Sequence, residues 1–181
     1  VLEIASRLNR SGAALACAID PAAPEGSVPA AEEGTTLALE AGYAVFRGEA
    51  LCGFLDTDAA LGADLLLGFA PQASYVLSEG DGGTVTVQLH TATASLSPVR
   101  DEEGAALQIA VCVRAGVTES SGADTADAEV LARLEEELSR AVAAQIEAAL
   151  EASKTLAADF LELWRVLPEV KNEDALASLR T

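Results

Sequence analysis

The stretch from Asp124 to Leu150 constrains the fold more than any other part of the chain. Its large aliphatic side chains recur every three or four residues, which predicts a long amphipathic helix with a single apolar stripe. An unbroken helix over this stretch is about 40 Å long and needs an apolar surface of similar length to cover. The stripe consists of Leu131, Leu134, Leu138, Val142, Ile146 and Leu150.

The segments before this helix have the patterns of strands joined by short turns. Residues 42–56 contain two apolar runs around the link Arg47-Gly48-Glu49, which predicts a β-hairpin. A second hairpin is expected around the glycine-rich turn Glu79–Gly83, and a polar loop containing Pro98 is expected over residues 97–104. The remaining predicted strands cover residues 74–77, 84–96 and 107–118.

The order of these elements predicts the fold class. Asp56-Thr57-Asp58 supplies the N-cap of a short helix that runs to about Leu67 and stops at Gly68. Strands joined by short turns must be antiparallel, and an amphipathic helix needs one apolar sheet face. We therefore expect an α+β fold with two layers: an antiparallel β-sheet covered on one face by the long C-terminal helix and shorter helices.

Both ends of the chain are expected to lie outside this core. Residues 1–16 suggest a short helix that Gly12 ends, and a mobile loop rich in proline, alanine, glutamate and glycine follows. After the long helix, apolar residues within 156–167 predict a second helical stretch, closed by Pro168. The predicted organisation is a lead-in over residues 1–34, a folded domain over residues 35–168 and a polar tail over residues 169–181.

The charge balance limits the partners. The chain has 29 acidic against 11 basic residues, which gives a net charge of −18. Such a polyanion repels nucleic acid phosphates and anionic lipid surfaces, so neither is an expected partner. No stretch approaches the roughly 18 consecutive apolar residues that a membrane-spanning helix needs.

No catalytic or metal-binding constellation is recognisable. His90, the only histidine, falls in the polar phase of its strand without a marked partner, so we interpret it as solvent-facing. The Glu79–Gly83 run is too short for a calcium loop. Cys17, Cys52 and Cys112 are not closely paired, and we interpret them as buried free thiols. We expect no catalytic, cofactor-binding or metal residue, no cofactor and no enzymatic activity.

Two further groups have ordinary structural interpretations. Trp164, the only tryptophan, falls in the apolar stripe of the second helical stretch and is expected to pack in the core. The run Glu135-Glu136-Glu137 is expected to be the solvated face of the long helix.

Two segments resemble a known family. Gly42-Tyr43-Ala44-Val45-Phe46-Arg47, followed by Leu51-Cys52-Gly53-Phe54-Leu55, resembles the hairpin "G-x-A-V-F-K … L-V-G-W/F-L" in the C-terminal domain of the Ger(x)C spore-germination proteins. Asp159-Phe160-Leu161-Glu162-Leu163 is similar to the family's "D-x-F-G-F-G" run, with Glu162 and Trp164 in place of glycines. The resemblance covers about residues 35–168.

The resemblance implies a non-catalytic subunit, the lipoprotein C subunit of a nutrient germinant receptor. Such a subunit lies at the outer face of the spore inner membrane and contacts membrane-embedded receptor subunits. Because the chain begins at Val1 and contains no methionine, we interpret it as a processed product or an excised fragment. We expect it to be soluble and the lipid anchor to be on a preceding segment. Cys17 lacks the hydrophobic leader of a lipidated cysteine.

Two alternatives remain open at this stage. One is a domain that binds an amino acid or sugar directly, in a pocket under the helix at residues 58–67. The other is an enzyme of unrecognised type that uses His90 with Asp81 or Glu79. The germinant, the contacting residues and the oligomeric state do not follow from the sequence.

Overall fold

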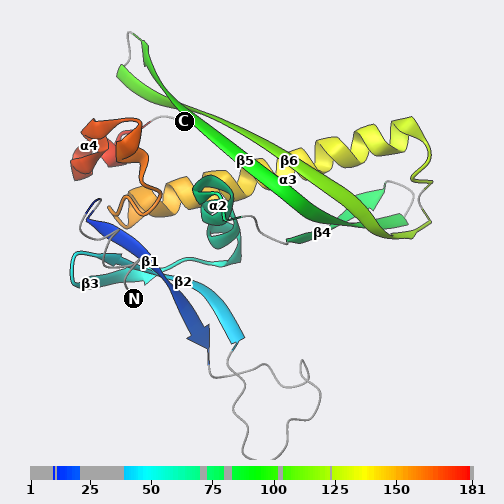
Figure 1. Cartoon of the computed structure of the whole chain (residues 1–181), viewed down its shortest axis with the longest axis horizontal. Coiled ribbons are helices and arrows are strands. Elements are labelled where there is room, and N and C mark those ends of the chain that lie inside the picture. Colours follow the sequence, from blue (N-terminus) through cyan, green and yellow to red (C-terminus); the bar gives the residue numbers. More distant parts are fainter. Residues whose placement is uncertain are drawn as a thin grey trace, which may run out of the picture.

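The computed structural model of the chain describes residues 10, 12–20, 39–69, 73–79, 83–101, 104–122 and 124–179. Its strands form two antiparallel sheets of three strands each, ordered β1-β2-β3 and β4-β5-β6 (Figure 1). The elements are β1 (Ala13–Asp20), β2 (Leu39–Arg47), β3 (Ala50–Phe54), α2 (Thr57–Leu67), β4 (Ser74–Glu79), β5 (Gly83–Asp101), β6 (Gly104–Ser121), α3 (Ala128–Thr155), η1 (Leu163–Arg165), η2 (Pro168–Lys171) and α4 (Glu173–Ala177).

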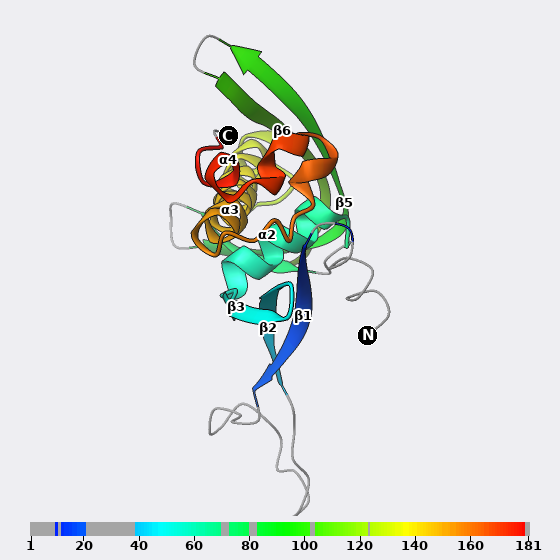
Figure 2. The same ribbon diagram turned by 90° about the vertical axis from the view of Figure 1, so that its left-hand side faces the viewer.

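The α+β class with antiparallel strands and a long covering helix is confirmed. The strands fall into two sheets rather than one because α2 follows the first hairpin and separates it from the strands that come later. Seen along the length of α3, α2 lies between the smaller sheet and α3 (Figure 2). The larger sheet, β4-β5-β6, extends along α3 and supplies the apolar face that this helix needs.

The opening hairpin and the helix after it form where the sequence predicts them. Arg47 of β2 pairs with Ala50 of β3 across the two-residue turn. Asp56 caps α2, and its carboxylate accepts a hydrogen bond of 2.9 Å from the Ala59 N–H. The helix ends at Gly68, whose φ of 74° is in the left-handed region that glycine adopts at low cost.

The second hairpin is longer than predicted. β5 and β6 pair continuously from Thr84 opposite Ser121 to Asp101 opposite Gly104, so the expected polar loop over residues 97–104 is wrong. Pro98 lies within β5 and faces Leu107. Among the described residues β4 pairs with β5 only over residues 83–88, so the far half of β5 has one open side. A proline, which lacks the N–H donor, is tolerated on such a side.

The sequence predicts no strand in the lead-in before residue 35, but the structure has one that includes residues 13–16. They begin β1, which pairs with β2 from Ala13 opposite Arg47 to Asp20 opposite Leu39. The small side chains of this segment carry no clear period, so the pairing with β2 decides its structure. The predicted helix before it and the mobile loop after it fall mostly on residues 1–9 and 21–38, which lie outside the described residues.

The predicted second helical stretch over residues 156–167 is also wrong. The long helix ends instead in a Schellman motif, in which the Ala158 N–H donates to the Ser153 carbonyl over 3.0 Å. The Ala157 N–H donates to the Lys154 carbonyl over 3.1 Å, and Ala157 has a φ of 47°. This left-handed residue reverses the chain direction, so helical hydrogen bonding cannot continue.

Asp159 fixes the segment after the reversal. Its carboxylate accepts hydrogen bonds from the Leu163 N–H over 2.8 Å and from the Trp164 N–H over 2.9 Å. A side chain that accepts hydrogen bonds from these main-chain N–H groups replaces the helical hydrogen bonds they would otherwise make. Only the short 3-10 turn η1 forms here.

The final residues are not the frayed polar tail that the sequence suggested. Val170, Leu176 and Leu179 are all buried, with 2–4% of their surface exposed. η2 and α4 carry these side chains back onto the core, and α4 contacts α3. Three aliphatic residues therefore anchor a segment whose composition is otherwise polar.

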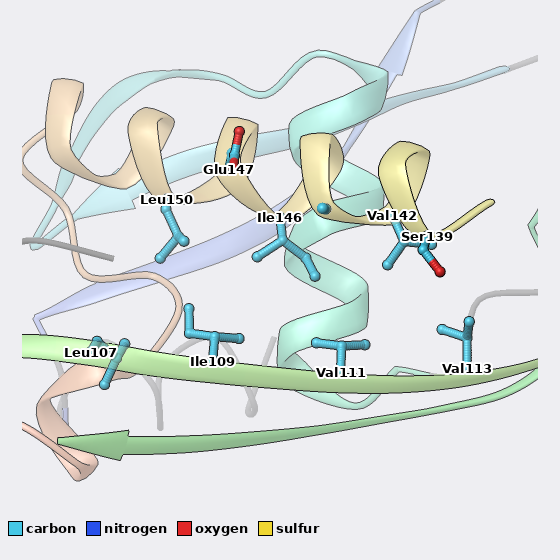
Figure 3. A pocket seen from close by; sticks show the side chains of 10 residues that line it. Leu107, Ile109, Val111, Val113, Ser139, Val142, Ile146, Glu147 and Leu150 are labelled. Atoms are coloured by element: carbon cyan, nitrogen blue, oxygen red, sulfur yellow. The ribbon is translucent and has the colours of Figure 1, made fainter. Parts of the chain in front are cut away.

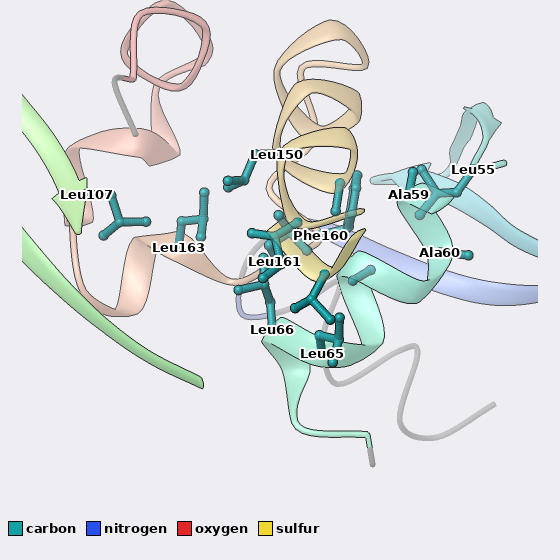
Figure 4. Packing of buried hydrophobic residues seen from close by; sticks show 14 of the residues in the cluster. Leu55, Ala59, Ala60, Leu65, Leu66, Leu107, Leu150, Phe160, Leu161 and Leu163 are labelled. Carbon is teal, nitrogen blue, oxygen red and sulfur yellow. The ribbon is translucent and has the colours of Figure 1, made fainter. Parts of the chain in front are cut away.

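The core is built from small and branched aliphatic side chains. The α3 stripe is buried as predicted from Leu134 to Leu150, whereas Leu131 is 38% exposed and Val130 is buried in its place. α2 crosses α3 at Gly62, where the backbones meet without an intervening side chain. Figure 4 shows the centre of the cluster, where side chains of α2, α3 and the segment after α3 converge.

Two tyrosine hydroxyl groups link separate elements, one of them buried and the other partly buried. The Tyr75 hydroxyl on β4 donates to Gln145 Oε1 on α3 over 2.6 Å. Burial raises the pKa of this tyrosine above its usual value, so the hydroxyl stays a donor. The Tyr43 hydroxyl on β2 donates to the Asp64 carboxylate on α2 over 2.7 Å.

Candidate interaction site

A groove of about 300 Å³ separates β6 from α3. Figure 3 shows its two walls, with the β6 side chains pointing toward α3 and Val142, Ile146 and Leu150 pointing back, while the Glu147 carboxylate points away from β6. The strand wall consists of Leu107, Ile109, Val111 and Val113, and the helix wall of Val142, Ala143, Ile146 and Leu150. Ser139 and Glu147 are the polar side chains of the lining.

The periods of the two elements produce this groove. Successive side chains of a strand point to opposite faces, so alternate β6 residues share the face toward α3. On α3, residues at a spacing of three or four form one row. Ile109, Val111 and Val113 remain half-buried, because the helix covers this part of the sheet without filling the space beside it.

The side chains that line the groove are mainly aliphatic, which suits the groove to holding apolar groups. Its polar lining is limited to a serine hydroxyl and a glutamate carboxylate, and both residues are exposed at its rim. β6 is also the edge strand of its sheet among the described residues. Apolar contact beside an edge strand is a typical setting for binding a protein segment.

The predicted candidate for catalysis, His90, lies elsewhere. It is exposed on β5 beside a register irregularity, with its ring next to Gly116 of β6, and it does not line the groove. Asp81 and the side chain of Glu79 lie outside the described residues. Within the described part of the chain, no group of three or more histidine, cysteine or acidic residues is placed to hold a metal ion.

The prediction of buried thiols is wrong for two of the three cysteines. Cys17 and Cys112 are exposed, and Cys52 is half-buried. Cys112 has apolar neighbours in sequence, but it alternates with Val111 and Val113 and so points to the opposite face of β6. In the part of the chain that the structure describes, the three cysteines form no disulfide.

A buried acidic cluster follows α3. Asp159 and Glu162 are 6% and 7% exposed, and Glu162 pairs with Arg165 over 2.8 Å and more distantly with Arg10 over 3.9 Å. Burial raises the pKa of the Asp159 carboxyl above its usual value, although hydrogen bonds from the Trp164 and Leu163 N–H groups oppose the shift. The cluster stabilises the fold of this segment, since Asp159 accepts from two main-chain N–H groups and Glu162 pairs with Arg165.

The tryptophan and the glutamate run behave largely as expected. Trp164 is half-buried and packs against the core. Glu135 and Glu136 are exposed, whereas Glu137 is half-buried and accepts a hydrogen bond of 3.2 Å from the Ser78 N–H of β4. This link between helix and sheet was missed, because spacing along the helix does not show which residue faces β4.

Apolar side chains are also exposed away from the groove. Phe54 and Leu51 on β3 are 65% and 50% exposed, and Val76 on β4 is 69% exposed. β3 and β4 are edge strands of their sheets among the described residues, so these side chains lie at sheet margins. Single exposed apolar residues are normal for folded proteins and define no site without a neighbouring cavity.

The structure is an α+β domain with a groove lined mainly by aliphatic side chains. A model of the family described as "Spore germination B3/GerAC like, C-terminal" matches residues 41–173. The chain therefore belongs to this family of spore germination proteins, as a domain of the C-subunit type.

A solved structure has the same fold. The crystal structure of the GerBC protein aligns with a TM-score of 0.75 at 12% identity, over 98% of this chain and 56% of that chain. The present chain thus spans about half the length of the protein it matches. No curated protein matches the chain at a significant level. In the described part of the chain, no helix has the length and apolar character needed to cross a bilayer.

Proposed function

We propose that the chain is the C-terminal domain of a non-catalytic germinant receptor subunit, which contributes to spore germination through protein contacts. The observation that carries the proposal is the family match over residues 41–173. The apolar groove beside an edge strand supports it, because it offers contact area without a converging set of acids, bases and nucleophiles. The partners we propose are the membrane-embedded subunits of the same receptor.

We place the whole subunit at the outer face of the spore inner membrane, held by a lipid on a segment that precedes this chain. The net charge of −18 supports an anchor outside this domain, because an acidic surface gains nothing from anionic lipid headgroups.

Co-purification tests this function. The full-length protein carries an affinity tag and is isolated from detergent-solubilised spore inner membranes, with a tagged unrelated spore lipoprotein as the control. We expect the receptor's membrane subunits to accompany the full-length protein and not the control. Equal recovery with both, or recovery with neither, would contradict the proposal.

A second candidate is a domain that binds a small molecule. The groove volume of about 300 Å³ is at the lower end of the usual range for ligand pockets, roughly 300–1,000 Å³. The structure leaves no space under α2 at Gly62, which packs directly against the main-chain carbonyl of Gln145. Amino acids and sugars need several polar groups, so the apolar lining favours protein contact instead.

A thermal-shift series with amino acids and sugars separates the two functions. A ligand that binds only the native domain raises its melting temperature, and above Kd the shift grows with the logarithm of the ligand concentration. We expect no shift across the series. A shift that the substitution Glu147→Gln abolishes would favour ligand binding in the groove.

A further inference from the structure

The two walls of the groove have matching lengths. The four β6 side chains from Leu107 to Val113 span about 20 Å of extended chain. The α3 residues from Ser139 to Leu150 span about 17 Å of helix. A strand laid along β6 presents alternate side chains at the same spacing as β6 itself, so about three of its side chains would enter the groove.

A site for an added strand needs a free strand edge as well as a groove for side chains, and β6 supplies that edge. In the order β4-β5-β6, β6 pairs with β5 on one side, and its other side has no strand partner among the described residues. An edge strand presents main-chain donors and acceptors in a row, to which an extended segment can add by hydrogen bonding. Hydrogen bonds between the two main chains would then provide affinity, and the groove would provide specificity for every second side chain of the bound segment.

The charge around the groove indicates the chemistry of the occupant. Glu147 lines the rim and is exposed, and Glu151 lies one turn further along the same exposed side of α3. Glu136, nearer the start of α3, lies 3.8 Å from Arg140 in an exposed ion pair. A segment with lysine or arginine beside its apolar residues complements this rim. A second copy of the chain is disfavoured, because both copies carry a charge of −18.

We propose that the β6 edge and the adjoining groove dock an extended segment of a receptor subunit, with aliphatic residues at alternate positions and lysine or arginine beside them. The inference rests on the proposed function, since it takes the partner to be a subunit of the same receptor. Beyond the proposed function, the inference specifies which surface of the domain binds the partner. It also specifies that the partner segment is extended and which of its side chains enter the groove.

The test uses short overlapping synthetic peptides that cover the extramembrane segments of the receptor's membrane subunits, titrated into this chain by calorimetry. We expect the peptides that bind to have the alternating apolar and basic pattern. Hydrogen exchange should then slow at the β6 amides of the complex. Absence of any binding peptide, or protection confined to α3, would overturn the proposal.

Adjacent alanines provide a matched pair of variants. Ala143 and Ala144 are both exposed on α3, but only Ala143 lines the groove. Arginine is a good helix former at either position, so both variants should fold. We expect Ala143→Arg to weaken peptide binding by about tenfold or more, because its side chain occupies the groove and repels basic residues. Equal affinities for Ala143→Arg and Ala144→Arg would overturn the proposal.

A charge-reversal pair tests the rim. Glu147→Lys should weaken peptide binding and reduce its dependence on salt, whereas Glu119→Lys, an equal change on β6 beyond the groove, should do neither. Sedimentation at the same concentrations checks for self-association. A dimer that Ala143→Arg dissociates would assign the groove to a second copy and overturn the choice of partner.

The same variants in the full-length protein separate this inference from the proposed function. If the wild type co-purifies with the membrane subunits and Ala143→Arg does so equally well, the groove is not the docking site, although the function stands. If the wild type does not co-purify, the proposed function fails, and the peptide titration still decides whether the groove binds a basic extended segment.

Discussion

The crossing of α2 over α3 gives the sharpest test of the packing. A Cβ atom added to Gly62 would overlap the Gln145 carbonyl oxygen and lie 2.5 Å from its carbonyl carbon, whereas real Cβ atoms keep at least 3.0 Å from other heavy atoms. The obstructing atoms belong to the α3 backbone, so no side-chain rotation can relieve the overlap. In Gly62→Ala the two helices must move apart by about 1 Å.

The magnitude follows from two opposing effects. Forcing a methyl group into a packed core costs about 1–3 kcal/mol, and a backbone obstruction places the cost at or above the upper end. Alanine is a better helix former than glycine by about 1 kcal/mol, which offsets part of it. We expect a net loss of about 2–3 kcal/mol, which lowers Tm by roughly 5–10 °C in a chain of this size.

Differential scanning calorimetry measures this change, with Gly68→Ala as the control. Gly68 has a φ of 74° and no atom within 4 Å of an added Cβ, so its substitution carries only the left-handed backbone penalty of about 1 kcal/mol. We expect Gly62→Ala to be the less stable of the two variants. A Gly62→Ala variant as stable as the wild type, or more stable, would refute the close crossing, because the overlap would then not outweigh the gain in helix propensity.

Three further changes have definite expected outcomes. Ala157→Gly should raise Tm, because the φ of 47° costs alanine about 1 kcal/mol and glycine almost nothing; an unchanged or lower Tm would contradict the Schellman motif. Tyr75→Phe should lower the free energy of unfolding by about 1–3 kcal/mol in urea titrations, because it leaves the buried side-chain oxygen Oε1 of Gln145 without its donor. For Asp159, desolvation raises the folded-state pKa, so the contribution of this group is greatest below the ordinary pKa of 3.8 and is lost as pH rises through the raised value. Urea titrations should therefore show Asp159→Asn improving relative to the wild type from pH 3.5 to pH 7, and a pH-independent difference would rule out the raised pKa.

Elements specified by neighbouring residues were predictable from the sequence. The first hairpin has a glycine in its turn, and α2 has a capping aspartate before it and a glycine after it. Each of these signals acts within a few residues of the element that it defines. The same holds for α3, whose aliphatic stripe predicts both a helix and the side that it buries.

Two elements do not follow from the pattern of apolar residues. β1 consists largely of small residues and becomes a strand because β2 lies beside it. The apolar spacing from Leu156 to Leu167 is compatible with helix, but the Asp159 side chain and the left-handed Ala157 impose another path. A tertiary contact therefore decides the structure of β1, whereas after α3 a side-chain to main-chain interaction within the segment competes with helix formation.

The groove could be predicted only in part. The alternating apolar residues from Leu107 to Val113 were recognised as one face of a strand, and the α3 residues opposite them as a helix stripe. The space between these faces depends on how far the β5–β6 hairpin extends, and that in turn depends on Pro98 remaining within the sheet. No single segment of the sequence carries this information.

Trp164 gives the chain an intrinsic optical reporter at one defined place. It is the only tryptophan, and its main-chain N–H is held by Asp159 just after the reversal that ends α3. Emission near 350 nm, or access of acrylamide to the indole, would therefore report when this junction opens, while circular dichroism follows the helices and sheets. If the junction detaches before the rest of the domain melts, the two signals will separate along the denaturation curve.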